Sequence, residues 1–176
     1  CNTIEKGSNG NKEFFAKWEV TDYNISYISE LDATNLNPTK YNCLTENIAL
    51  KELYKDGYEF VGWFDSNTYN NKVETINKGT TGNITLYAKW NEVNYTIEYV
   101  DKFNVSNTNK TSFTINSSIF DILPLEKVGY DFVGWFDNAT GTGPALTEIA
   151  KGSKGNLIRI IGTNVCMFLQ KIRGCV

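Results

Sequence analysis

Histidine is absent from this 176-residue chain. Histidine is the commonest general base in enzymes and a frequent metal ligand. Its absence removes Ser–His and Cys–His nucleophile pairs and most zinc sites. We therefore expect no enzyme activity, no catalytic residue, no metal site and no cofactor.

Positive charge and long apolar runs are also scarce. The chain has 17 Lys and Arg residues against 20 Asp and Glu residues, and its net charge is −3. A nucleic-acid-binding protein normally has a basic face, so we expect no nucleic-acid partner. No apolar run reaches the roughly 20 residues that a membrane-spanning helix needs, so we expect no such segment in this chain.

What the chain does contain is an internal repeat. Gly57–Asp65 (GYEFVGWFD) recurs as Gly129–Asp137 (GYDFVGWFD), 72 residues later. Two further pairs of segments share this period of 72 residues: Thr3–Trp18 with Thr75–Trp90, and Tyr23–Tyr27 with Tyr95–Tyr99. Three matches at one spacing identify tandem copies of one unit.

The repeat divides the chain. We expect residues 1–19 to be the C-terminal remnant of a preceding repeat and residues 20–91 to be a complete repeat. Residues 92–156 would be a second repeat that lacks its final strand, since no ending of the type Tyr-Ala-Lys-Trp follows Asn156. Residues 157–176 would be a divergent basic tail, either disordered or translated out of frame.

Cysteine is used sparingly, at Cys1, Cys43, Cys166 and Cys175, with no Cys-x-x-Cys spacing. Only Cys43 lies inside the complete repeat, and its counterpart one period later is Ile115. The pattern favours a small apolar role for Cys43 over a disulfide framework.

Within one repeat, alternating apolar residues at Tyr23–Tyr27, Tyr58–Gly62 and Ile84–Trp90 predict strands. Glu46–Lys55 is predicted to be a helix capped by Thr45, and Ile119–Leu123 a shorter helix stopped by Pro124. Each repeat then has the order strand-strand-helix-strand-strand, an α+β fold. Trp63 and Trp90 are the expected core anchors.

In order and spacing, the motifs GYxFVGWFD, KGxxGN and LYAKW resemble the Listeria–Bacteroides repeat, also called the internalin B-repeat. The resemblance covers residues 1 to about 156. It implies a small ubiquitin-like β-grasp domain, repeated in tandem in secreted or wall-anchored bacterial surface proteins that are commonly adhesins or internalins. The repeated residues that we expect to be structurally important are Gly57, Tyr58, Phe60, Gly62, Trp63, Gly79, Gly82, Trp90, Gly129, Tyr130, Phe132, Gly134 and Trp135.

Three patterns could carry chemistry, and each has a simpler structural interpretation. The carboxylate pairs Glu59 with Asp65 and Asp131 with Asp137 are candidates for binding or cleaving a sugar, but also suit exposed strand and turn positions. Lys78–Asn83 superficially resembles a phosphate loop but lacks its residue order. Asp137–Gly141 offers oxygen ligands without the spacing of a calcium loop. We favour the structural interpretation in all three cases.

These features predict a structural spacer repeat of an extracellular bacterial surface or secreted protein, in contact with neighbouring repeats of the same chain. The alternative is a module that binds a host surface protein or a glycan through exposed aromatic side chains.

Overall fold

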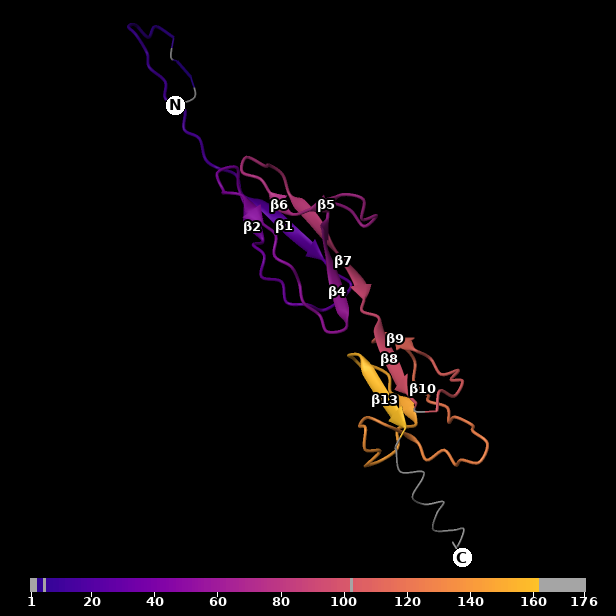
Figure 1. The fold of residues 1–176 in the computed structure, drawn as a ribbon. Helices are drawn as coiled ribbons and strands as arrows, with labels where there is room; N and C mark the ends of the chain where they lie inside the picture. The colour runs from indigo at the N-terminus through magenta and orange to yellow at the C-terminus, as the bar shows by residue number, and fades with distance from the viewer. Residues whose placement is uncertain (1–2, 5, 102, 162–176) are drawn as a thin grey trace, which may run out of the picture. The chain divides into compact units, whose positions relative to one another are not determined.

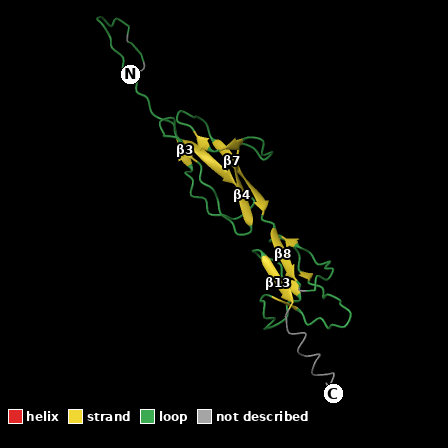
Figure 2. Ribbon diagram, in the orientation of Figure 1, coloured by secondary structure: helices red, strands yellow, loops and turns green. Residues whose placement is uncertain are grey.

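The computed structural model describes residues 3–4, 6–101 and 103–161, and the regular elements in these residues are all β-strands (Figures 1 and 2). The first repeat contains β1 (Tyr23–Ile28), β2 (Lys40–Tyr41), β3 (Ile48–Ala49), β4 (Tyr58–Phe64), β5 (Lys72–Val73), β6 (Thr75–Ile76) and β7 (Ile84–Glu92). The second contains β8 (Tyr95–Val100), β9 (Ser112–Phe113), β10 (Phe120–Asp121), β11 (Trp135–Phe136), β12 (Glu148–Ile149) and β13 (Leu157–Ile161).

The two repeats have matching sheets. The main sheet of the first has the order β2-β1-β7-β4-β5, and that of the second has the order β11-β13-β8-β9. In both, a parallel pair lies inside the sheet: Ile25 of β1 is opposite Ile84 of β7, and Ile97 of β8 is opposite Leu157 of β13. Figure 1 shows β13 beside β8. Each repeat also has a small antiparallel pair, β3 with β6 and β10 with β12.

The predicted α+β fold with one helix per repeat is wrong, because the described residues contain no helix. The segment predicted as a helix, Glu46–Lys55, forms β3 instead, in which Ile48 and Ala49 pair with β6. The Leu50 N–H donates to the Glu74 carbonyl at 2.9 Å, not to a carbonyl four residues earlier. A helix of about ten residues is marginal by its own propensity, so these distant hydrogen bonds decide the conformation.

The second predicted helix, Ile119–Leu123, is wrong for the same reason. Phe120 and Asp121 form β10 against β12, and the Ile122 N–H donates to the Thr147 carbonyl at 2.7 Å. Ile122 is buried, whereas its neighbours Asp121 and Leu123 are exposed. That alternation has the period of two residues typical of a strand.

The structure also differs from the expectation that the second repeat lacks its final strand. β13 lies between β8 and β11 in the sheet, as β7 lies between β1 and β4. The sequence of β13, LIRII, has no similarity to the expected ending, but its β-branched residues suit a strand. Residues 162–176 of the predicted basic tail lie outside the described residues.

The chain divides into two compact units. One comprises residues up to Ile28 together with Leu36–Lys51 and Trp63–Tyr87, and the other comprises Ser29–Asn35, Glu52–Gly62 and the chain from Ala88 onward. Buried apolar residues recur at equivalent positions of the two repeats, as the pairs Ile25 and Ile97, Tyr41 and Phe113, Leu53 and Leu125, and Trp63 and Trp135 illustrate. At each of these positions, the two repeats bury side chains of similar volume in their β cores.

Candidate functional site

The repeated tryptophans Trp63 and Trp135 are core residues, with exposed fractions of 2% and 1%. Each tryptophan also forms a hydrogen bond to the segment that was predicted to be a helix. The Nε1–H of Trp63 donates to the Lys51 carbonyl at 2.9 Å, and that of Trp135 donates to the Leu123 carbonyl at 2.9 Å. A buried indole therefore has its one donor satisfied in both repeats.

Two asparagines bond to the same backbone residues as these tryptophans. They were not identified from the sequence. The side chain of Asn37 accepts from the Lys51 N–H at 2.6 Å and donates to the Lys51 carbonyl at 3.0 Å. Asn109 makes the same two bonds to Leu123, at 2.6 and 2.9 Å. Both asparagines are buried. The signal that could have revealed them is their spacing, because they too are 72 residues apart.

Tyrosines pack on the same tryptophans. The ring centroids of Tyr27 and Trp63 are 4.9 Å apart, as are those of Tyr99 and Trp135. Their hydroxyls donate to the carbonyls of Pro38 (2.9 Å) and Lys110 (3.0 Å). Burial raises the pKa of Tyr27 to about 12 and also raises the pKa of Tyr99. Both effects come from the cost of placing a phenolate away from water.

The repeated glycines occupy backbone conformations that favour glycine. Gly57 and Gly129 share a φ of +81°, and Gly62 and Gly134 have φ values of +146° and +148°. Gly79 and Gly82, at +87° and +93°, form the turn that leads into β7. Gly57, Gly79, Gly82 and Gly129 thus have the φ values of turn glycines, whereas Gly62 lies inside β4. The structural importance of the motif as a whole remains a prediction.

The other repeated motif residues are less buried than the core tryptophans. Trp90, Tyr58, Phe60 and Phe132 are half-buried, and Tyr130 is 37% exposed. Trp90 packs on Phe60 at the edge of the core, so its burial is smaller than that expected for a core anchor.

The carboxylates considered for sugar chemistry are all exposed. Asp65 accepts a hydrogen bond from Asn71 at 3.0 Å, and Asp137 accepts one from the adjacent Asn138 at 2.9 Å. Asp65 and Asp137 thus stabilise turns, in agreement with the structural interpretation of these residues.

The Lys78–Asn83 loop is held by contacts to its own repeat. The Lys78 N–H donates to the Asn47 side chain at 2.8 Å, and the Lys78 ammonium forms an ion pair with Glu46. The Gly82 carbonyl accepts a hydrogen bond from the Tyr41 hydroxyl at 2.5 Å. The loop uses these groups for its own turn and for packing on the sheet.

The Asp137–Gly141 turn is likewise held by local hydrogen bonds. The side-chain oxygen of Asn138 accepts from the Thr140 hydroxyl at 2.7 Å and from the Thr142 N–H at 3.1 Å. In the described part of the chain, no three acidic, cysteine or histidine side chains gather in a way that could hold a metal ion.

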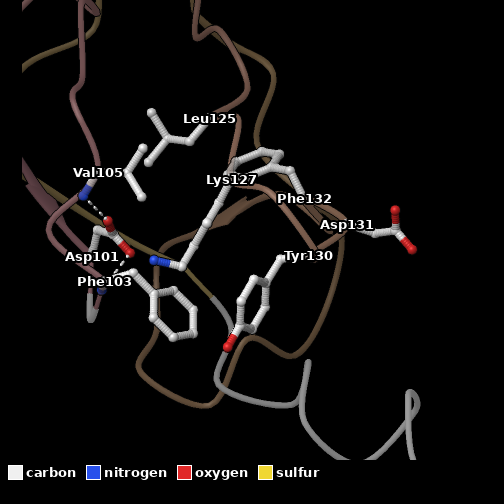
Figure 3. A pocket seen from close by; sticks show the side chains of 8 residues that line it. All are labelled: Asp101, Phe103, Val105, Leu125, Lys127, Tyr130, Asp131 and Phe132. Atoms are coloured by element: carbon white, nitrogen blue, oxygen red, sulfur yellow. Dashed lines mark hydrogen bonds between the residues drawn. The ribbon is translucent and has the colours of Figure 1, made fainter.

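A small cavity with a volume of about 30 Å³ lies in the second repeat. Figure 3 shows the rings of Phe103 and Tyr130 facing each other near the ammonium group of Lys127, which lies 4.6 and 5.5 Å from the two ring centroids. Asp101 accepts hydrogen bonds from the N–H groups of Phe103 (3.0 Å) and Val105 (2.7 Å). The remaining lining residues are Val105, Leu125, Asp131 and Phe132.

The cavity thus combines aromatic and aliphatic walls with two carboxylates and one ammonium group.

The repeated sheet and the repeated Asn–Trp connection define a class: tandem copies of a small β repeat. The model of the Listeria–Bacteroides repeat domain matches residues 23–89 and 95–158. The chain therefore belongs to the Listeria–Bacteroides repeat family, as the sequence resemblance indicated.

Three relatives show where such repeats occur. A putative membrane protein of Evansella cellulosilytica is 34% identical over 70% of this chain and 18% of its own length. A putative Gly-rich membrane protein of the same organism is 28% identical over 86% of this chain and 17% of its own length. Internalin H of Listeria monocytogenes is 34% identical over 49% of this chain and 16% of its own length.

This chain spans less than one fifth of the length of each of these relatives. No solved structure matches it. Among the residues that the structure describes, none forms a helix with the length and apolar character needed to cross a membrane.

Proposed function

We propose that this chain is a structural spacer of a bacterial cell-surface or secreted protein, in which tandem repeats hold another domain away from the surface. The observation that carries the proposal is the recurrence of the Asn37–Lys51–Trp63 connection as Asn109–Leu123–Trp135. What recurs in each copy is a structural framework of core aromatics and turn glycines. A stalk needs this kind of repetition, whereas an enzyme needs a single set of reactive groups.

The relatives support the location. Two carry names that describe membrane proteins, and a third is an internalin. A repeat shared by such proteins is consistent with an extracellular position at the cell surface, and we extend that position to this chain. We also propose that the chain has no enzymatic activity of its own.

A second candidate is a binding module for a host surface protein or a glycan. The observation that favours it is exposed aromatic surface, since Tyr54 is 80% exposed and Phe103 is 41% exposed. Exposed aromatic side chains are common at glycan and protein interfaces.

Glycan arrays and pull-downs from host-cell surface extracts, both with the full chain, separate the two candidates. The spacer proposal predicts no reproducible ligand. Binding that is saturable and that is lost in a Tyr54→Ala variant would contradict a pure spacer and favour the binding module. Because Tyr54 is highly exposed, this variant should keep its fold, and equal thermal unfolding of the two proteins is the control.

A further inference from the structure

Gly57 and Gly129 occupy the same position of the two repeats and share a φ of +81°, but only Gly57 is buried. A Cβ on Gly57 would lie between 2.6 and 3.0 Å from three side-chain atoms of Ile115, whereas a Cβ on Gly129 would meet no atom within 4 Å. Ile115 of the second repeat therefore packs directly on the Gly57 backbone. This close approach leaves no room for a side chain at position 57.

Gly57 and Ile115 lie in the same compact unit of the chain, because Glu52–Gly62 clusters with the residues from Ala88 onward. Only Val93 and Asn94 separate β7 from β8. The Val93 N–H donates to the Gly57 carbonyl at 3.0 Å, so this short connection is itself bonded to the Gly57 turn. A short connection keeps the groups on its two sides at a high effective concentration, and a small contact can then stay formed.

Hydrogen bonds support the packing of Ile115. The side-chain nitrogen of the adjacent Asn116 donates to the Tyr58 hydroxyl oxygen and to the Glu92 carboxylate, both at 2.8 Å. Tyr58 follows Gly57 directly in the sequence, so one pair of adjacent residues contacts another. We call Gly57, Tyr58, Ile115 and Asn116 the junction.

An ion pair lies beside the junction. The Lys154 ammonium is 2.5 Å from the carboxylate of Asp56, the residue before Gly57. The two side chains are 44% and 56% exposed. An ion pair with this exposure contributes little to stability in water, so the packing of Ile115 on Gly57 is the main contribution.

We propose that the junction couples the stabilities of the two repeats, so that each repeat is more stable while the other is folded. In repeat arrays, stability is approximately the sum of the intrinsic stability of each repeat and of its contacts with its neighbour. The buried Asn–Trp connection belongs to the intrinsic part, and the junction supplies the contact between neighbours. This coupling goes beyond the spacer proposal, since a binding module could have the same junction.

Hydrogen exchange in the full chain, followed by NMR, tests the coupling. The probes are the Ile25 and Ile97 amides, which lie in the equivalent strands β1 and β8 and each donate to a backbone carbonyl at 2.8 Å. Gly57→Ala inserts a Cβ into the space that Ile115 occupies. We expect exchange at Ile97, in the other repeat, to become at least about 5-fold faster.

Gly79→Ala is the matched control for backbone strain. Gly79 has a φ of +87° in the first repeat, and a Cβ there would meet no atom within 4 Å. This variant should accelerate exchange at Ile25 and leave Ile97 unchanged. Unchanged exchange at Ile97 in Gly57→Ala would overturn the coupling, and so would equal acceleration of Ile97 in both variants.

The coupling must also act in the opposite direction. Ile115→Ala, in the second repeat, should accelerate exchange at Ile25 at least about 5-fold. Ile119→Ala makes the same change at a position that is 56% exposed and should leave Ile25 unchanged. Asn116→Ala alters an exposed side chain, so it should keep the fold and accelerate Ile25 about 3-fold. Unchanged exchange at Ile25 in both Ile115→Ala and Asn116→Ala would contradict the proposal.

Discussion

At the scale of single residues, Asn37 and Asn109 connect segments that are distant in the sequence. Each makes two hydrogen bonds to one backbone residue beside a buried tryptophan. Asn37→Ala removes both bonds and leaves the Lys51 N–H without this partner. We expect the free energy of unfolding to fall by about 2 kcal/mol, measured by urea denaturation. Asn109→Ala is the matched variant and should cost a similar amount; a loss below about 0.5 kcal/mol in both would contradict the role of these side chains.

Tyr27 makes the stability of the folded chain depend on pH. Its pKa is about 12 in the folded chain, against an ordinary value of 10.0. Between these values the folded state keeps the phenolic proton that the unfolded state loses. The stability contributed by the neutral phenol is therefore fully present below pH 10 and is lost as the pH rises toward 12.

Unfolding by urea at a series of pH values checks this dependence. We expect stability to fall less steeply above pH 10 in Tyr27→Phe than in the native chain. The variant should also be less stable at neutral pH, because it loses the bond to the Pro38 carbonyl. Parallel pH profiles for the two proteins would show that Tyr27 does not titrate in this way.

Two glycines of the repeated motif differ in both backbone strain and crowding. A Cβ on Gly129 would meet no atom within 4 Å, whereas a Cβ on Gly134 would lie 2.6 Å from the Cβ of Ala145. Their φ values are +81° and +148°, and the second lies further from the left-handed region that other residues can adopt. Gly129→Ala should cost about 1–2 kcal/mol from backbone strain alone. Gly134→Ala should cost at least about 1 kcal/mol more, because it adds overpacking and greater backbone strain. Equal losses in urea denaturation would contradict this distinction.

At the scale of elements, β13 is the strand on which the second repeat depends. It lies between β8 and β11, so its removal separates β11 from β8 and β9. A chain that ends at Asn156 should therefore lose hydrogen-exchange protection throughout β8, while β1 of the first repeat keeps it. The full chain is the control. Retained protection at Ile97 in the shortened chain would mean that the repeat folds without this strand.

The secondary-structure elements could be predicted only in part from the sequence. The alternation of apolar and polar residues predicted strands at Tyr23–Tyr27, Tyr58–Gly62 and Ile84–Trp90, which lie within β1, β4 and β7. It failed at Glu46–Lys55, where Ile48, Leu50 and Leu53 fit both a helical and a partly extended pattern. The choice depends on hydrogen bonds that the N–H groups of Lys51 and Leu50 donate to Asn37 and Glu74, which local sequence does not reveal.

At the scale of the whole molecule, the 72-residue period predicted the repeat array, and the resemblance of its motifs to a known repeat predicted the family. The buried positions of Trp63 and Trp135 agree with the motif that defined the period. The cavity beside Asp101 was not predicted, because its lining residues come from segments that are separated in the sequence.

The central claim is that both repeats are built on the same buried indole connection. Hydrogen exchange of the four tryptophan Nε1–H signals, followed by NMR at low protein concentration, tests this claim most directly. The two indoles that donate to buried carbonyls, those of Trp63 and Trp135, should exchange slowest, and the half-buried Trp90 should exchange faster. Trp18, at 89% exposure, should exchange fastest. Fast exchange of either Trp63 or Trp135 would contradict the claim, because it would leave the two repeats without a common framework.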